Sequence, residues 1–390
     1  MSTAHLPEED QLSGEQVSNV DSHGKKLSLA HRLYTGDVSW DFVGRKKLWF
    51  LISGVVLGLA VLSLLLRGLN LGIEFKGGAD FSAPTQVNSQ TIGKVTDAVM
   101  DTGLPEMDAT TVLTVGSGEV KVQTRTLSDP EVKQVRAAIA EAAGAPTEDV
   151  AYSLIGASWG DQITKKGVQA LVVFLVLVSL LIWIYFRDWK MSIAALVALM
   201  HDLLLTVGVY SWLGFTVTPS SLIGVLTILG YSLYDTVVVF DKVKENVTDL
   251  SKQARTYSSA ANHAVNQVLV RSLNTTIIGV LPVAALLFAG AFVLGSGPLK
   301  DLGLALFVGM VAGAYSSIFI ATPLLAWLRE REPKMREHRE NLERRAARKA
   351  ARAHHGDDQA KTAVATASGA PVRTTRKQTT RTTRSARKGK

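Results

Sequence analysis

The sequence has no cysteine among its 390 residues. This absence excludes structural disulfides, thiolate metal sites and a cysteine nucleophile, although it leaves the redox compartment open. The sequence also lacks a nucleotide-binding glycine loop, an HExxH metal motif and a nucleophile triad. We therefore expect neither an enzyme nor a cofactor or metal site.

Apolar residues, by contrast, make up 47% of the chain and are gathered into long runs. Six runs can each cross a hydrocarbon core of about 30 Å at about 1.5 Å per residue. The first follows a long polar segment and exceeds a signal-peptide core, so we expect it to remain in the membrane. The six runs are Leu48–Leu66, Val168–Phe186, Met191–Leu213, Ser221–Phe240, Ser272–Leu294 and Leu302–Leu328.

Lysine and arginine near the ends of these runs predict the orientation. The ends on the side of the amino terminus are rich in both, as at residues 45–47 and 242–255, whereas the loop 214–220 has neither. Both termini are therefore expected in the cytoplasm. The predicted organisation is a polar cytoplasmic segment 1–44, a first span 45–67, an outer domain 68–166, a bundle 167–328 with a cytoplasmic connector at about 241–270, and a basic, disordered cytoplasmic tail 329–390.

The tail 329–390 carries 19 Lys and Arg against 7 Asp and Glu, a net charge of +12, while the whole chain has +8. Its low-complexity end has too few apolar residues to form a core, which predicts disorder. We expect it to contact anionic lipid head groups. RNA contact is the alternative, and we expect no specific nucleic-acid site.

The long loop 68–166 alternates between strand-like and helical patterns. A glycine-containing turn at 116–118 joins two strand-like pieces as a hairpin, and Asp129-Pro130 opens the second helix. The order β-α-β-β-α-β predicts a ferredoxin-like α+β domain. Its predicted elements are 79–83, 89–103, 109–115, 119–127, 129–144 and 149–156.

Asp235 interrupts the fourth apolar run, in GYSLYDTVVVFDKVKEN. A carboxylate at a helix centre is unfavourable by roughly 2.5 to 3.5 kcal/mol, so it indicates function. Ser232, Asp235 and Thr236 follow i, i+3, i+4 spacing and predict a polar stripe. Asp235 lies about 9 Å inside Asp241 along the helix, too deep for so short a side chain to reach water easily.

Arg271, Asn274 and Thr275 repeat the same spacing at the start of the fifth run. If Arg271 faces Asp235, the guanidinium favours the carboxylate and desolvation favours the acid, so the group could take up and release protons. The alternative is that Arg271 only anchors the helix at the interface.

His201 and Asp202 lie near the centre of the third run. Adjacent helical residues project about 100° apart, so we expect that they do not both face one narrow partner. They either belong to a polar interior or fasten two spans together. No second helix supplies metal ligands at a suitable spacing, which argues against zinc or iron.

Glycines recur where helices or turns could approach closely. Gly54 and Gly58 form GxxxG, and Gly303, Gly309 and Gly313 punctuate the sixth run, a pattern typical of helix packing. LGIEFKGG, residues 71–78, predicts a tight turn where the outer domain meets the membrane.

These motifs resemble the SecF family, the smaller membrane subunits of the SecDF complex that assists the bacterial Sec translocase, a branch of the resistance-nodulation-division (RND) superfamily. The resemblance runs from Asp41 to Trp327 and lies in GIEFKGG, MHDLLLTVG, GYSLYDTVVVFDKVKEN and RSLNTT. It implies an α-helical polytopic protein with six transmembrane helices, half of an RND-type membrane domain, in the bacterial plasma membrane. The family usually has Asn at Tyr234, and Arg-Ile-Arg at Lys242-Val243-Lys244.

The resemblance implies a proton pathway through Asp235, Arg271 and Thr275, working with an aspartate of SecD. His201, Asp202, Ser232, Thr236 and Asn274 would support it as a polar interior, and Gly72, Glu74, Gly77 and Gly78 belong to the family motif after the first span. The implied partners are SecD, the SecYEG translocon, a YajC-like accessory subunit and the translocating preprotein.

The implied function is coupling of the proton-motive force to late steps of preprotein export. Two alternatives stay open. One is an RND-type proton-driven exporter component for lipids or small molecules, and the other is a scaffold whose buried polar groups only fasten helices. Sodium could also replace the proton, because a carboxylate with hydroxyl neighbours can serve either ion.

Overall fold

The computed structural model describes residues 39–88, 90–293 and 297–348. The chain divides into two units, Met1–Arg336 and Glu337–Lys390. In the second unit the described residues 337–348 are helical, which corrects the expectation of disorder for this part of the tail. The predictions for residues 1–38 and 349–390 lie outside the described residues, and everything below concerns the first unit.

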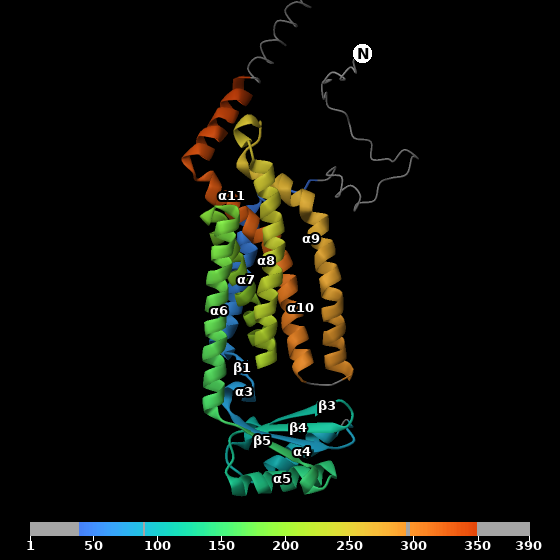
Figure 1. Ribbon diagram of the computed structural model, residues 1–390. Helices are drawn as coiled ribbons and strands as arrows, with labels where there is room; N and C mark the ends of the chain where they lie inside the picture. Colours follow the sequence, from blue (N-terminus) through green and yellow to red (C-terminus); the bar gives the residue numbers. More distant parts are fainter. Residues whose placement is uncertain (1–38, 89, 294–296, 349–390) are drawn as a thin grey trace, which may run out of the picture. The chain divides into compact units, whose positions relative to one another are not determined.

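Within the described residues, six helices are long and apolar enough to cross a membrane, as predicted (Figure 1). The fifth ends in a π-helical segment, η4, and the sixth passes from α10 through a π-helical segment, η5, into α11. The bounds are α2 Lys46–Arg67, α6 Ala157–Phe186, α7 Trp189–Leu213, α8 Pro219–Val247, α9 Tyr257–Phe288 with η4 Ala289–Val293, and α10 Pro298–Ser316 with η5 Ser317–Ala321 and α11 Thr322–Glu330.

Three of the helices extend well past their predicted apolar runs. α6 begins eleven residues ahead of the predicted Val168, α9 begins at Tyr257, and α8 continues to Val247. Hydropathy locates only the stretch that suits hydrocarbon, and a helix can continue into water as an amphipathic segment. Between α8 and α9, residues 248–256 hold only a short 3₁₀ turn, η3 Leu250–Lys252.

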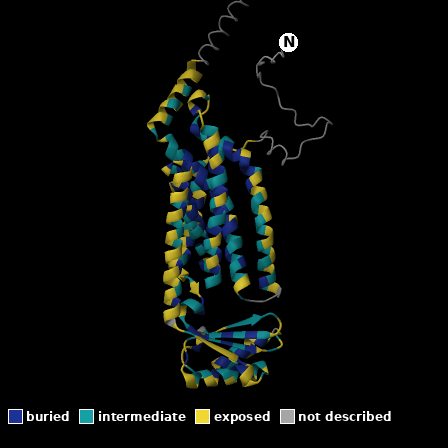
Figure 2. Cartoon of the chain, in the orientation of Figure 1, coloured by how far each residue is buried: buried dark blue, intermediate teal, exposed yellow. Residues whose placement is uncertain are grey.

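The interior of the bundle is formed by α7, α8 and the α10–α11 helix. About half of the apolar window of α7 and of the sixth span is buried, against 6% for α9. Figure 2 shows the same contrast, with exposed residues along α6 and α9. Small residues such as Ala194, Ala198 and Ala321, all fully buried, let these helices approach closely.

Residues 40–43 pack into the bundle although they precede the first span. Asn262 accepts hydrogen bonds from the backbone N–H groups of Phe42 and Val43, at 2.8 and 3.1 Å. Asn266 accepts one from the N–H of Trp40 at 2.8 Å. Phe42 and Val43 are buried in the main hydrophobic core. This contact connects the start of the first span to α9.

The domain between α2 and α6 has the predicted ferredoxin-like topology. Its four antiparallel strands follow the order β3-β4-β2-β5, the arrangement of a split βαβ fold. Phe81, Val122, Val95 and Ile139 form a fully buried core between the sheet and the helices. The elements are β2 Gly78–Pro84, α4 Thr91–Met100, η1 Met107–Ala109, β3 Thr111–Val115, β4 Glu119–Thr124, α5 Asp129–Ala143, η2 Thr147–Asp149 and β5 Ala151–Ile155.

A two-stranded parallel pair, which the sequence patterns did not predict, joins the end of the first span to the α7–α8 loop. β1 (Asn70–Leu71) pairs with β6 (Thr216–Val217) in that loop. Two-residue strands carry no readable alternation of polar and apolar residues, so the pairing is visible only in three dimensions. A single helical turn, α3 (Ile73–Lys76), follows β1 directly.

Candidate functional site

Asp235 lies on the buried side of α8, where α9 passes it. The hydroxyl of Ser272 lies 2.8 Å from one carboxylate oxygen of Asp235 and 2.9 Å from the other. Only 6% of Asp235 and 3% of Ser272 is exposed. Ser232 and Thr236, the other residues of the predicted polar stripe on α8, are also buried. Asp235 therefore has a neutral hydrogen-bond donor as its partner.

Arg271 does not face Asp235, which differs from the arrangement considered above. Its side chain is exposed, and among the described residues it forms no ion pair. The neighbouring residue Ser272 takes that position because one helical step rotates a side chain by about 100°. Thr275 is half-buried and donates to the backbone oxygen of Arg271 at 2.8 Å, while Asn274 is exposed. Arg271 and Asn274 thus lie on the outward side of α9, while Thr275 lies at its border with α8.

Asp202 lies at the centre of a second buried polar cluster. Its Oδ2 accepts hydrogen bonds from Ser232 of α8 at 2.5 Å and from Ser316 of α10 at 2.8 Å. Its Oδ1 lies 3.2 Å from Nδ1 of His201. Thr206 donates to the backbone oxygen of Asp202 at 2.8 Å. The cluster joins the three interior helices.

His201 and Asp202 both face α10, contrary to the expectation from their adjacent positions. Asp202 meets Ser316, and the ring of His201 lies 5.9 Å from the ring of Tyr315. Two adjacent residues of α7 thus meet two adjacent residues of α10. Tyr315 in turn contacts Ser53 of α2 through its hydroxyl at 2.9 Å.

Four serines that the sequence interpretation did not select complete these clusters: Ser53, Ser272, Ser316 and Ser317. Ser317 lies 3.0 Å from Thr236 through their hydroxyls and lies beside Asp235. The only signal for it was the run Tyr315-Ser316-Ser317 in an otherwise apolar stretch. A serine in a membrane helix is too common, and too easily satisfied by its own backbone, to be recognised by type alone.

Tyr234, where the family usually has Asn, is 53% exposed. Its side chain therefore lies apart from the buried groups around Asp235. The neighbouring Tyr231 is half-buried and donates to the backbone oxygen of Thr275 at 2.9 Å. This contact joins α8 to α9 near the Asp235–Ser272 pair.

The glycines of GIEFKGG permit close backbone contacts at the edge of the α+β domain. Gly77 ends α3 with a φ of 79°, and Gly78 starts β2 with a φ of 152°. A Cβ on Gly78 would lie 2.3 Å from the backbone oxygen of Thr124, and one on Gly72 would lie 3.0 Å from that of Val217. Glu74 lies in the first turn of α3, which follows Gly72. The motif therefore forms a tight backbone turn, as predicted, between α2 and the α+β domain.

An ionic cluster closes the end of the bundle where α7 begins and α11 ends. Arg329 pairs with Asp188 and Glu332, and Lys190 donates to Glu332 at 2.7 Å. Burial alone would raise the pKa of Glu332, but the hydrogen bonds from Lys190 and Arg329 outweigh it and hold that pKa below its usual range. The cluster fixes the entry of α7 against α11.

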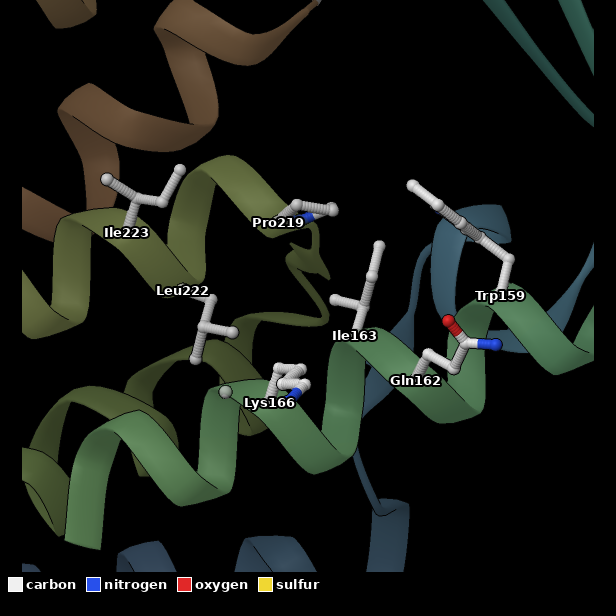
Figure 3. A pocket seen from close by; sticks show the side chains of 8 residues that line it. Trp159, Gln162, Ile163, Lys166, Pro219, Leu222 and Ile223 are labelled. Atoms are coloured by element: carbon white, nitrogen blue, oxygen red, sulfur yellow. The ribbon is translucent and has the colours of Figure 1, made fainter. Parts of the chain in front are cut away.

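A groove of about 400 Å³ lies between the first turns of α6 and α8 (Figure 3). It is almost entirely apolar, and Leu222 lies about 20 Å along α8 from Asp235 at 1.5 Å per residue. It is therefore no part of the carboxylate site. In the described part of the chain, no three His, Asp or Glu side chains are grouped to hold a metal ion. The groove is lined by Trp159, Gln162, Ile163, Lys166, Gly167, Pro219, Leu222 and Ile223.

Six spans around a buried polar interior, with one α+β domain after the first span, define a multi-pass membrane protein of the transport type. A family model described as protein export membrane protein SecD/SecF, C-terminal, matches residues 134–331, and the SecD/SecF GG motif matches residues 62–79. The chain belongs to the SecF family, the protein translocase subunits of the SecDF protein export complex.

The similarity to individual relatives extends over most of the chain. This chain is 45% identical to protein translocase subunit SecF of Streptomyces coelicolor, over 85% of this chain and 88% of that one. It is 43% identical to that of Mycobacterium tuberculosis, over 85% and 77%. The crystal structure of SecDF, a translocon-associated membrane protein from Thermus thermophilus, is similar with a TM-score of 0.65 at 29% identity, covering 78% of this chain. This chain spans 40% of that SecDF chain.

Proposed function

We propose that this SecF-family chain acts with SecD to couple proton flow across the bacterial plasma membrane to late steps of preprotein export, with Asp235 as the group that gains and loses the proton. The observation that carries this proposal is the environment of Asp235. It is a buried carboxylate in a spanning helix, and its partner Ser272 is neutral.

The Ser272 hydroxyl suits a carboxylate that changes its protonation state. A hydroxyl can donate to an ionised carboxylate and can accept from a protonated one. A fixed salt bridge would favour only the ionised form. Moving one charge across 100 mV is worth about 2.3 kcal/mol, so successive protons can bias an equilibrium between two conformations by a few kcal/mol.

Arg271 is the outward-facing part of this pathway, and Thr275 is its part at the border of α8 and α9. Because Arg271 is exposed and directly precedes Ser272 in the chain, a carboxylate of SecD could approach it from outside the bundle. The resemblance to SecDF, which holds more chain than this subunit alone, supports SecD as that partner. A change of charge at Asp235 would then shift α8 and α9 relative to the rest.

The orientation of the chain and its further partners belong to the same proposal. The amino- and carboxyl-terminal segments lie in the cytoplasm, the α+β domain lies outside, and its movement acts on the emerging preprotein. SecYEG and a YajC-like subunit are further partners in the proposal, and the basic tail contacts anionic lipid. The lysine and arginine distribution at the helix ends supports the orientation.

The test is preprotein export in vesicles that hold this chain, SecD and SecYEG, with ATP held constant and a proton gradient imposed or absent. Asp235→Asn should remove the stimulation by the gradient. Asp241→Asn is the matched control, since Asp241 is an exposed aspartate on the same helix. Stimulation of the Asp235→Asn variant equal to that of wild type would refute the coupling. Stimulation by a sodium gradient alone would show that sodium, and not the proton, is the coupling ion.

A further inference from the structure

His201 and Asp202 are a second pair of titratable groups inside the bundle, and the proposed pathway through Asp235 does not use them. Asp202 is 1% exposed and His201 is 4% exposed. Two hydroxyls, of Ser232 and Ser316, point their donors at one oxygen of Asp202. Because both donate to Oδ2, the other oxygen is left to His201.

The net charge of the His201–Asp202 pair depends on the number of protons that it holds. With one proton between His201 Nδ1 and Asp202 Oδ1, the pair is a neutral imidazole beside a carboxylate and carries one negative charge. A second proton makes an imidazolium beside a carboxylate, which has no net charge. A net charge in the membrane interior is unfavourable, so proton uptake replaces a missing counter-ion.

Within the described residues, no lysine or arginine neutralises Asp202, and its recorded ion pair is with His201. Tyr315 on α10 lies beside the pair, with its ring 5.9 Å from the ring of His201. On α8, Asp235 lies three residues after Ser232, which contacts Asp202. α2 contributes Ser53, which contacts the Tyr315 hydroxyl. The charged side chains of α2, α6, α10 and α11 lie in the first or last three turns of those helices.

The second ring nitrogen of His201 offers the entry point. Its Nε2 is buried and has no hydrogen-bond partner among the described residues. An unpartnered polar atom in a buried position is unfavourable and calls for an explanation. A role in proton binding supplies that explanation, because Nε2 carries a hydrogen only while the ring holds the second proton.

The pair is connected to the Asp235 site through two helices. On α8, Ser232 lies one turn, or about 4.5 Å, before Asp235. On the sixth span, Ser316 contacts Asp202, and the next residue, Ser317, contacts Thr236 and lies beside Asp235. The π-helical segment η5 begins at Ser317, and such segments are frequent at functional sites.

We propose that His201 and Asp202 form a second proton-carrying site, connected to Asp235 by the Ser232 turn of α8 and the Ser316–Ser317 step of the sixth span. This inference rests on the proposed proton coupling and adds a site to it. In each cycle one proton binds at His201 Nε2, neutralises the pair, and later leaves from the same atom.

The test is nuclear magnetic resonance of ring-¹⁵N-labelled histidine in the full chain with SecD in lipid bilayers, from pH 9 to pH 5. The His201 signals, identified by their loss in His201→Gln, should pass from a neutral tautomer to imidazolium as the pH falls. Asp202→Asn should abolish this transition in the same range. Asp235→Asn should shift its midpoint, whereas Asp241→Asn should leave it unchanged.

A His201 ring that stays neutral down to pH 5 overturns the proposal, and so does a transition that is identical in wild type and Asp235→Asn. Both measurements are made on proteins that retain the Asp202 cluster, so they decide the matter even if the Asp202→Asn variant misfolds. Full gradient-driven export by Asp235→Asn would instead refute the proposed function, whatever the state of His201.

Discussion

Ser272 presents a single hydroxyl between the two oxygens of Asp235, at 2.8 and 2.9 Å. One hydroxyl has one proton, so it can donate to only one of these oxygens at a time. The other oxygen can then carry a proton of its own. The contact between α8 and α9 thus accommodates both the ionised and the protonated form of Asp235.

Ser272→Ala should reduce gradient-driven export while leaving the complex assembled. The variant removes a hydrogen bond worth about 1.5 to 3 kcal/mol when its partner is charged, which corresponds to roughly a tenfold or greater change in the population of the ionised form. Ser272→Thr keeps the hydroxyl and should retain most of the activity. Export rates at a fixed proton gradient measure both. Equal rates for Ser272→Ala and wild type would show that the hydroxyl has no part in coupling.

Arg271→Ala should lower export without lowering the thermal stability of this chain, because the Arg271 side chain is exposed and forms no ion pair among the described residues. Exposed charges contribute about 0 to 1 kcal/mol to stability. The measurement is thermal unfolding of the purified chain beside export with SecD. Arg271→Lys, which keeps the charge, is the control. A large loss of stability would favour a scaffold role for Arg271.

Gly309→Ala should destabilise the bundle, whereas Gly58→Ala should not. A Cβ on Gly309 would lie 2.6 Å from Ile228, while one on Gly58 would meet nothing within 4 Å. Overpacking costs about 1 to 3 kcal/mol, and alanine in an uncrowded helix gains about 0.5 to 1 kcal/mol over glycine. Thermal unfolding of the isolated chain compares the two. Equal effects would contradict the packing of α10 on α8.

Glu131 should titrate far below a free glutamate. Hydrogen bonds from Arg125, and from the backbone and side chain of Ser128, lower its pKa from 4.5 to about 2. Because the pKa is lower in the folded state, the contribution of Glu131 to stability is complete above about pH 4.5 and is lost as the pH falls toward about 2.

Carboxyl ¹³C resonances of Glu131 in the full chain measure this titration directly. Arg125→Ala should move the midpoint toward 4.5, since it removes the largest cause. Arg136→Ala removes the same charge from α5 itself without touching Glu131, so it should leave the midpoint in place. A midpoint near 4.5 in wild type would show that the Arg125–Glu131 pair does not form in solution.

The topology could be predicted from the sequence because periodic burial sets the elements of the α+β domain and continuous apolar runs set the spans. Alternating apolar residues and a glycine turn predicted the element order β-α-β-β-α-β, whose strands form the sheet β3-β4-β2-β5, and hydropathy predicted the six spans. Asp235 was recognisable because a carboxylate in an apolar run is rare.

Helix rotation and helix partners could not be read from the same patterns. Whether Arg271 or Ser272 faces Asp235 depends on a rotation of about 100°, which tertiary packing decides. Likewise, Gly54 and Gly58 suggested a packed face by their spacing, yet a Cβ on either would meet nothing within 4 Å in this chain. In contrast, Gly313 does pack, since a Cβ there would lie 2.8 Å from the Cβ of Ser232.

The measurement that tests the central claim most directly is infrared difference spectroscopy of the chain with SecD in bilayers, recorded as the pH is stepped down. Protonation of Asp235 should produce a carbonyl band of a protonated carboxyl group that is absent from Asp235→Asn and present in Asp241→Asn. A spectrum in which Asp235→Asn and wild type are identical would show that Asp235 does not change its protonation state, and would contradict proton coupling through this residue.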